Sequence, residues 1–119
     1  MARLGMVTLD SANARALAAW WAEQLDGKLV DEYDGEYCMV TGGPIVLGFQ
    51  QVSDPTPGKN KAHFDLTAND SEGGRTGLVA AFVASGAKHI ATRGEELSFQ
   101  WDVLEDPDGN QFCIADHFE

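Results

Sequence analysis

Two stretches of the chain, residues 62–70 and 99–114, carry most of the residue types that could do chemistry. In the first stretch His63 and Asp65 stand two positions apart, so a strand would place both side chains on the same face. A histidine beside a carboxylate can act as a general base near neutral pH, and it can equally serve as a hydrogen-bonding group in a polar cup. The pair therefore predicts either a proton-transfer site or one wall of a binding site.

The second stretch carries aromatic side chains and a cysteine. Phe99 and Trp101 either belong to the core or line a cup, and as lining they favour a flat or cationic ligand, because each cation–π contact contributes about 0.5–2 kcal/mol. Cys113 is either a small buried apolar residue or a nucleophile. The second role needs a positive neighbour that lowers the thiol pKa, and His63 is the candidate for it.

The helices and strands that must position these residues are expected from a sequence pattern that occurs twice along the chain. The first copy runs G-M-V-T-L-D-S-A-N and then A-R-A-L-A-A-W-W-A-E-Q-L, and the second runs A-H-F-D-L-T-A-N-D and then G-R-T-G-L-V-A-A-F-V-A-S. In each copy a strand pattern precedes a helix pattern, and a glycine, a short strand and a hairpin follow. This predicts two copies of one supersecondary unit that share a site, because a solenoid needs at least about three repeats.

The order of elements predicts an α+β fold of two tandem βαβββ modules, which form a curved, cup-like mixed sheet with helices on the outer face. At 119 residues the chain is expected to be one domain, with module one at about 1–52, a linker at about 53–61 and module two at about 62–119. Each helix should bury an apolar stripe and end at a glycine. The first stripe is Leu17, Trp21 and Leu25, ending at Gly27, and the second is Leu78, Val79 and Phe82, ending at Gly86.

Alternation along the strands assigns each side chain to the cup or to the helix. With Phe64 and Leu66 packed under the second helix, the residues that alternate with them face the cup, and the same rule applies to the first strand. The cup-facing residues by this rule are Met6, Thr8, Asp10, His63, Asp65 and Thr67.

The motif D-P-D-G-N at residues 106–110 predicts a type I turn with Gly109 in the left-handed conformation, which pairs Asp106 with Asn110. A slip of one residue would exchange the two faces of the hairpin. The predicted register places Phe99, Trp101, Val103 and Cys113 on one face, and Phe112 and Ile114 toward the helix.

Charge and composition exclude some partners. The net charge of −11 argues against nucleic acid and anionic membranes, because phosphate binding needs clustered Lys and Arg. No apolar run approaches the roughly 20 residues of a membrane span, and the two cysteines form no CxxC pattern, which favours a cytoplasmic protein with reduced thiols. His89 and His117 lie outside the cup pattern, and we expect both to face solvent.

Three segments together carry a family resemblance: T-L-D-S-A-N-A-R-A-L-A-A-W-W-A-E-Q-L, K-N-K-A-H-F-D-L and W-D-V-L-E-D-P-D-G-N-Q-F-C-I. With them the chain resembles the vicinal oxygen chelate superfamily, also called the glyoxalase/bleomycin-resistance/dioxygenase superfamily, and within it the small glyoxalase-like branch. The resemblance implies paired βαβββ modules around a U-shaped cup, commonly in a homodimer. Function does not follow from it, because this fold hosts isomerases, dioxygenases, lyases and binding proteins.

The resemblance also implies where metal ligands would stand, on the first and last strand of each module. Carried over, these positions are Met6, Leu47 (or its neighbour Gly48), His63 and Cys113. Only His63 is a customary ligand, while Cys113 could bind a soft metal as thiolate. Two ligands are fewer than the three or so of a catalytic site, so we expect no cofactor, with a divalent metal as the alternative.

Other catalytic groups of the superfamily have no counterpart. The glutamates that glyoxalase I uses at its ligand positions are missing, and the tyrosine that extradiol dioxygenases carry before D-P-x-G is replaced by Val103. An enzyme of this kind would thus be a glyoxalase-like lyase or isomerase rather than an extradiol dioxygenase.

The sequence therefore supports two main functions. The first is a metal-independent protein that sequesters a small organic ligand, cationic or aromatic, in an acidic, aromatic cup. The alternative is a lyase or isomerase that uses His63 and Asp65 as acid–base, with or without a non-standard metal site; an assembly module using Trp20 is a third reading. The predicted ligand-binding residues are Met6, Thr8, Asp10, Leu47, His63, Asp65, Thr67, Phe99, Trp101, Val103 and Cys113.

Overall fold

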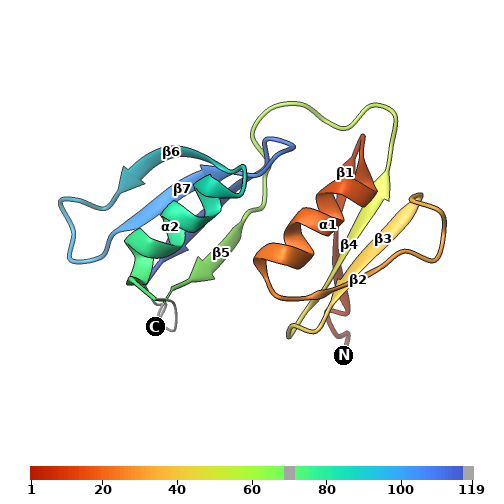
Figure 1. Ribbon diagram of the computed structural model, residues 1–119, viewed down its shortest axis with the longest axis horizontal. Coiled ribbons are helices and arrows are strands. Elements are labelled where there is room, and N and C mark those ends of the chain that lie inside the picture. The colour runs from red at the N-terminus through yellow and green to blue at the C-terminus, as the bar shows by residue number, and fades with distance from the viewer. Residues whose placement is uncertain (69–71, 117–119) are drawn as a thin grey trace. The chain divides into compact units, whose positions relative to one another are not determined.

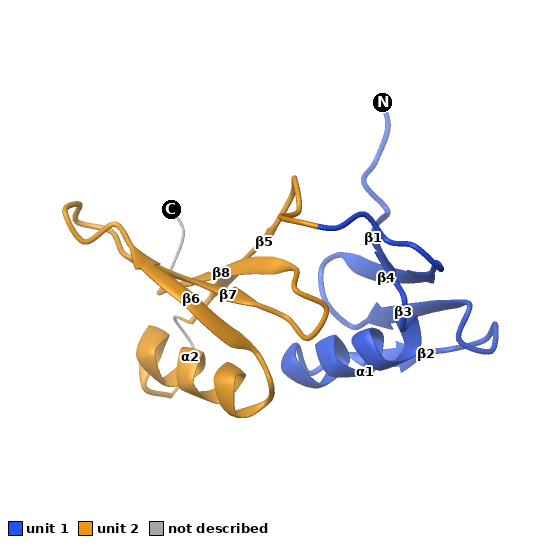
Figure 2. Cartoon of the chain, turned by 90° about the horizontal axis from the view of Figure 1, so that it is seen from above, with its two compact units in different colours: residues 1–57 blue, residues 58–119 orange. Residues whose placement is uncertain are grey.

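The computed structural model describes residues 1–68 and 72–116, and Figure 1 shows their helices and strands. They form two compact units, residues 1–57 and 58–119, coloured separately in Figure 2. Each unit has one four-stranded sheet with a helix on one face. His117, predicted to face solvent, lies outside the described residues.

The first unit has the order βαβββ. Strand β1 pairs with β4 in parallel. Strand β3 lies between β4 and β2 and pairs with both in antiparallel orientation, so the sheet order is β1-β4-β3-β2. Its elements are β1 (Met6–Ser11), α1 (Ala14–Gln24), β2 (Lys28–Val30), β3 (Tyr37–Thr41) and β4 (Val46–Gln51).

The second unit repeats this topology, with the sheet order β5-β8-β7-β6 and one parallel pair, β5 with β8. The predicted α+β fold of two tandem βαβββ modules is confirmed, and each sheet is open rather than closed into a barrel. Its elements are β5 (Phe64–Thr67), α2 (Gly74–Ala84), β6 (Lys88–Arg93), β7 (Trp101–Glu105) and β8 (Gln111–Ala115).

Helix α1 packs on its sheet through part of the predicted stripe. Leu17 and Trp21 are buried, but Leu25 is 41% exposed, so its predicted place in the stripe was wrong. The reason is that α1 ends at Gln24, and Asp26 takes the left-handed conformation at φ 52°. Gly27 is required for a different reason from the predicted stop, because a Cβ there would lie 2.7 Å from Val40 Cγ1.

Helix α2 contributes less to the core of its unit than was predicted. Phe82 is its only buried residue, with its ring 5.3 Å from that of Phe112, while Leu78 and Val79 are half-buried. Gly86 follows the helix with φ 113°, as the predicted glycine stop requires. An ion pair, described below, supplies part of the attachment that apolar packing supplies for α1.

The hairpin between β7 and β8 has the predicted register. Asp106 N–H donates to the carbonyl of Asn110 and Gly109 N–H to that of Asp106, with Gly109 at φ 85°. Val103 therefore stands opposite Cys113, and Leu104 opposite Phe112. None of the helices in the described parts of the chain is long and apolar enough to cross a membrane.

Candidate functional site

The open face of the second sheet, the face turned away from α2, carries the candidate site. Phe112 contacts Phe82 of α2, so the neighbouring residue Cys113 projects from the opposite face. Cys113 lies on β8 between Asp65 of β5 and Val103 of β7, which are its cross-strand neighbours. These side chains therefore share the open face.

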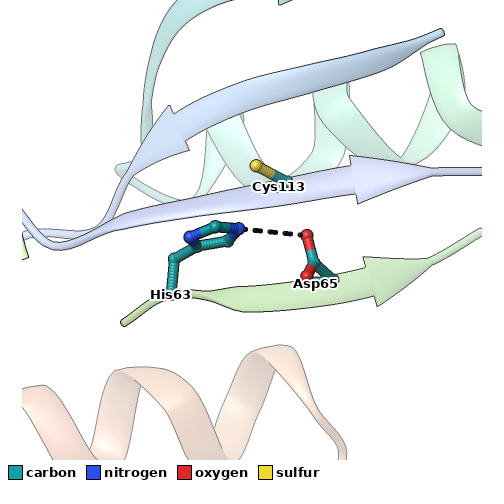
Figure 3. A group of neighbouring side chains, drawn as sticks. All are labelled: His63, Asp65 and Cys113. Carbon is teal, nitrogen blue, oxygen red and sulfur yellow. Dashed lines mark ion pairs between the residues drawn. The ribbon is translucent and has the colours of Figure 1, made fainter. Parts of the chain in front are cut away.

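His63, Asp65 and Cys113 form a compact group on this face (Figure 3). His63 Nε2 lies 3.4 Å from Asp65 Oδ1, and one ligand atom from each of the three residues lies within 4.8 Å of the others. The side chains of His63 and Asp65 are about half exposed, whereas Cys113 is buried. The predicted acid–base pair is thus close enough for proton exchange through a slight movement or a water.

The Cys113 thiol is held in its protonated form. Burial raises the pKa of the thiol, and the nearby Asp65 carboxylate raises it further. The positive charge of Lys59 lowers the pKa, but by less than these two effects raise it. A nucleophilic cysteine needs the opposite shift. The environment therefore fits a buried apolar cysteine better than a reactive thiolate.

A hollow of about 450 Å³ lies over this group. Its volume falls within the range of roughly 300–1,000 Å³ that is typical of small-molecule sites. Six of the predicted ligand-binding residues line the hollow together, although the sequence placed them on three separate segments. The lining is Lys59, His63, Asp65, Arg93, Phe99, Trp101, Val103, Gln111 and Cys113.

Two aromatic rings form one side of the hollow. The ring centroids of Phe99 and Trp101 lie 6.0 Å apart with an interplanar angle of 34°. Phe99 is 36% exposed, so it is a lining residue rather than part of the core. The sequence left open whether this pair belongs to the core or lines a cup, and in the structure both residues line the hollow.

The polar part of the lining is more basic than the sequence suggested. Lys59 and Arg93 both line the hollow, while Asp65 is its one carboxylate. The expectation of an acidic cup rested on Asp10 and Asp65, and Asp10 lies in the other unit.

Sequence reasoning missed three lining residues, Lys59, Arg93 and Gln111. Gln111 could have been found, because it alternates with Cys113 along β8. Lys59 lies in a segment that was interpreted only as a linker. Arg93 follows an irregularity in β6 between His89 and Ala91, and simple alternation fails across it.

The predicted site residues of the first unit lie on its own sheet. Thr8 Oγ1 lies 3.1 Å from the Tyr37 hydroxyl, which in turn donates to Met6 Sδ at 3.2 Å. A Cβ at Gly48 would lie 2.5 Å from the same hydroxyl, so Tyr37, which was not predicted, covers the strand here.

Leu47 and Thr67 differ from the other predicted lining residues in where they lie. Leu47 is only 9% exposed and belongs to the core, and its neighbour Gly48 takes the opposite face. Thr67 is exposed at the end of β5 and does not line the hollow. Neither position offers a metal ligand in this structure.

The group His63, Asp65 and Cys113 fits a zinc ion by the number and type of its donors. Catalytic zinc sites use about three protein ligands, drawn from His, Cys and carboxylates, and leave one position open. The sequence count of two ligands omitted Asp65, whose carboxylate the structure adds to the set. Zinc in such a site polarises a carbonyl oxygen or activates a bound water.

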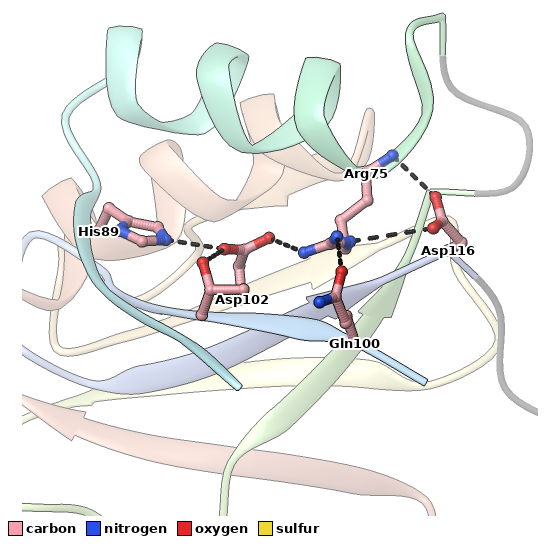
Figure 4. A network of polar contacts seen from close by, with 6 residues as sticks. Arg75, His89, Gln100, Asp102 and Asp116 are labelled. Atoms are coloured by element: carbon pink, nitrogen blue, oxygen red, sulfur yellow. Dashed lines mark hydrogen bonds and ion pairs between the residues drawn. The ribbon is translucent and has the colours of Figure 1, made fainter. Parts of the chain in front are cut away.

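A second polar network lies on the other face of this sheet, under α2 (Figure 4). Asp102 is 6% exposed and accepts hydrogen bonds from Arg75 Nη1 at 2.6 Å and Thr92 Oγ1 at 2.7 Å. His89 Nε2 lies 2.8 Å from the same carboxylate. His89 is exposed, as predicted, with 39% of its side chain accessible to solvent. Its ring also joins this network, and the sequence gave no sign that Asp102 would be its partner.

The fold and the site now define a class of protein. Paired βαβββ units, each with an open sheet face, are the architecture of the vicinal oxygen chelate superfamily. Residues 6–115 match the family model of the glyoxalase-like domain, and the chain belongs to this family. No curated protein matches the chain.

Solved structures share the fold at low sequence identity. A glyoxalase/bleomycin resistance protein/dioxygenase family enzyme from Burkholderia phytofirmans PsJN has 22% identity and a TM-score of 0.73, covering 95% of this chain and 97% of that one. Lactoylglutathione lyase from Agrobacterium tumefaciens has 15% identity and a TM-score of 0.69, covering 97% and 93%. The bleomycin resistance determinant encoded on transposon Tn5 has 17% identity and a TM-score of 0.63, covering 99% and 100%.

Proposed function

We propose that the protein binds a small organic molecule in the hollow of the second unit, and that this binding needs no metal. The observation that carries the proposal is the composition of the lining, with Phe99 and Trp101 on one side and charged groups beside them. Ligand sites combine an apolar surface with a few polar groups that fix orientation. Aromatic and charged side chains of this kind bind a ligand directly, without an ion between them.

The test uses a neutral fluorescent probe, N-phenyl-1-naphthylamine, with protein treated with a chelator. We expect saturable binding to the wild type and at least about tenfold weaker binding to Trp101→Ala, because that variant loses most of a buried aromatic contact. His63→Ala should change the affinity less than Trp101→Ala does. Leu97→Ala is the control, because Leu97 is exposed and does not line the hollow.

Two results would count against this function. One is an affinity for the probe that Trp101→Ala leaves unchanged, which would move binding away from the hollow. The other is binding that appears only after a divalent metal is added. Circular dichroism of each variant must show that the fold is retained.

A second candidate function is a glyoxalase-like lyase or isomerase in which His63 moves a proton and Asp65 orients and supports it. It is favoured by the His63–Asp65 distance of 3.4 Å and by the position of both side chains at the hollow. The test is turnover of the hemithioacetal formed by methylglyoxal and glutathione, with and without zinc. This function predicts that His63→Ala abolishes turnover while probe binding survives, and a wild type without turnover would refute it for this substrate.

We also propose that the protein is cytoplasmic, in keeping with its two free cysteines, and that it is a homodimer, as the superfamily resemblance implies. Light scattering should then give a mass of twice 12.8 kDa at micromolar concentration. A mass of 12.8 kDa would refute the dimer and leave the binding proposal untouched, since every lining residue of the hollow belongs to one chain.

A further inference from the structure

The charges around the hollow differ from those of the rest of the chain. The chain has 8 Lys and Arg against 19 Asp and Glu, with a net charge of −11. The hollow is lined by two of these cations, Lys59 and Arg93, and by a single carboxylate, Asp65. A strongly acidic protein therefore has a mainly basic lining in a hollow where the aromatic rings of Phe99 and Trp101 are exposed.

The position of Arg93 depends on a bulge in β6. His89 pairs with Leu104 and Ala91 pairs with Val103, so β6 has one residue more than β7 between these pairs. The extra residue reverses the alternation of faces beyond it. As a result Thr92 bonds Asp102 under α2, and Arg93 stands opposite Trp101 on the open face. Without the bulge Arg93 would face α2.

Lys59 is held at the hollow by its neighbour Asn60. The Asn60 side chain accepts a hydrogen bond from Gln111 N–H at 2.7 Å and donates to the Gln111 carbonyl at 3.1 Å. These two bonds join the segment before β5 to the start of β8. Lys59 thus approaches the hollow from a fixed backbone rather than from a free linker, and its charge reaches Cys113.

Neither cation is neutralised within the parts of the chain that the structure describes. Arg15 and Arg75 each pair with carboxylates there, whereas Lys59 and Arg93 have no ion pair to any described residue. Asp65, in contrast, already contacts His63 at 3.4 Å. A cationic ligand would find its one acidic partner engaged, and an anionic ligand would find two available cations.

We infer that the ligand of this hollow is an aromatic anion, such as an aromatic carboxylate, with its ring on Phe99 and Trp101 and its acid group paired with Arg93 and Lys59. This inference rests on the proposed function and names the ligand class for it. Arg is suited to the role because its planar fork pairs with a carboxylate through two hydrogen bonds. Of the two ligand classes that the sequence left open, aromatic or cationic, the inference keeps the aromatic ring and replaces the cation with an anion.

The test compares two dyes that share their rings and differ in charge. 8-Anilinonaphthalene-1-sulfonate carries a sulfonate, and N-phenyl-1-naphthylamine has the same rings without it. We expect the wild type to bind the anionic dye at least about tenfold tighter than the neutral one, and to lose much of this preference at high salt. Because the net charge of −11 repels an anion, such a preference must come from local cations.

Substitutions of the two cations test whether these residues cause the preference for the anionic dye. Arg93→Gln and Lys59→Gln should weaken binding of the anionic dye and leave binding of the neutral dye unchanged. Lys88→Gln is the matched control, because Lys88 lies at the other end of β6, is exposed and does not line the hollow. It should change neither affinity.

The outcomes separate this inference from the proposed function. Equal binding of both dyes, or an anion preference that Arg93→Gln and Lys59→Gln retain, overturns the inference but supports binding in the hollow. Binding of neither dye to the folded wild type overturns both. Binding of the anionic dye that survives Trp101→Ala also overturns the inference, because the aromatic half of the site would then be unused.

Discussion

At the scale of single residues, Asp102 is the residue whose substitution we expect to lower the free energy of unfolding most. Its carboxylate is buried under α2 and accepts bonds from Arg75 and Thr92, with His89 beside it. Removing one partner of a buried ion pair costs more than the pair contributes, because the remaining charge stays buried without a counterion. The Arg75 side chain is only 17% exposed, and its other carboxylate partner, Asp116, is exposed and lies farther away, at 3.9 Å from Nε, so Arg75 would be the poorly compensated charge.

We expect Asp102→Asn to lower the free energy of unfolding by about 3 kcal/mol, since it leaves Arg75 without its buried carboxylate. Urea unfolding followed by circular dichroism measures the change. Asp54→Asn, at an exposed loop position, is the control and should be neutral. A loss below about 1 kcal/mol would mean that the network is solvated and contributes no more than a surface pair.

The same carboxylate predicts a dependence on pH. Burial raises the pKa of Asp102, but the hydrogen bonds from Thr92, His89 and Arg75 outweigh burial and hold the pKa below its ordinary 3.8. A depressed pKa contributes stability that is fully present above 3.8 and is lost as the pH falls toward the folded value. The stability difference between wild type and Asp102→Asn should therefore shrink below pH 3.8. An equal difference at pH 3 and pH 7 would contradict this cause.

At the scale of elements, the two helices are fastened in the same way. Each has an arginine as its second residue, Arg15 in α1 and Arg75 in α2. Arg15 pairs with Asp31 at 2.5 Å and Arg75 with Asp102 at 2.6 Å, so each arginine ties its helix to a carboxylate of its own unit. The pair is exposed in the first unit and buried in the second, where α2 has fewer apolar contacts to rely on.

The loop between β6 and β7 positions the aromatic wall of the hollow through Gly94. This residue has φ 78°, and a Cβ there would lie 2.1 Å from the Phe99 carbonyl oxygen and 2.8 Å from the Trp101 ring. Gly109 has φ 85° but nothing within 4 Å of the corresponding position. Both glycines thus have a backbone conformation that other residues rarely adopt, but an added Cβ would collide with neighbouring atoms only at Gly94.

We expect Gly94→Ala to lower the free energy of unfolding by roughly 2–4 kcal/mol and to weaken probe binding, because Phe99 and Trp101 must move. Gly109→Ala should cost about 1 kcal/mol, from the backbone conformation alone, and leave binding intact. Thermal unfolding and dye titration measure the two effects. Equal costs for the two variants would show that the loop yields to the extra atom.

How far the sequence could predict this molecule also differs between elements. Regular alternation along β5, β7 and β8 placed His63, Asp65, Trp101, Val103 and Cys113 on one face, and all five line the hollow. Alternation failed in β6, where the bulge turns Arg93 to the open face, since a bulge leaves no mark in residue type.

Two other failures have physical causes of their own. The resemblance left Leu47 or its neighbour Gly48 as the site position of this strand, and the structure turns Gly48 to the open face and Leu47 to the core. Tyr37 was missed because its hydroxyl reaches Thr8 and Met6 from a strand 29 residues further along the chain. Contacts of this kind depend on the pairing of strands that are far apart in the chain, which no turn motif fixes as D-P-D-G-N fixes the β7–β8 hairpin.

At the scale of the whole molecule, an acidic protein carries a basic, aromatic hollow in its second unit. The repeat duplicates the βαβββ topology but not the site: the first unit places Met6, Thr8 and Tyr37 on its open face, and the second places His63, Asp65 and Cys113 there. The two units therefore share the scaffold but carry different residues on their open faces.

The metal content of the purified protein is also a property of the whole molecule. We expect protein purified without chelator to contain no stoichiometric metal, and added zinc, nickel, manganese or iron(II) to leave probe affinity unchanged within about twofold, because the hollow binds through rings and through Lys59 and Arg93, which repel a metal cation. Elemental analysis and titration measure this. A stoichiometric metal that disappears in His63→Ala would contradict it and would favour the lyase or isomerase.

The most direct test of the central claim is a titration of the ¹⁵N-labelled, chelator-treated protein with whichever of the two dyes binds more tightly, followed by backbone amide shifts. Binding in the hollow predicts saturable shifts on the open face of the second sheet, at Trp101, Val103 and Cys113, and smaller ones along α2. Shifts confined to α2 or to the first unit, or the absence of saturable shifts, would contradict the claim that this hollow is the ligand site.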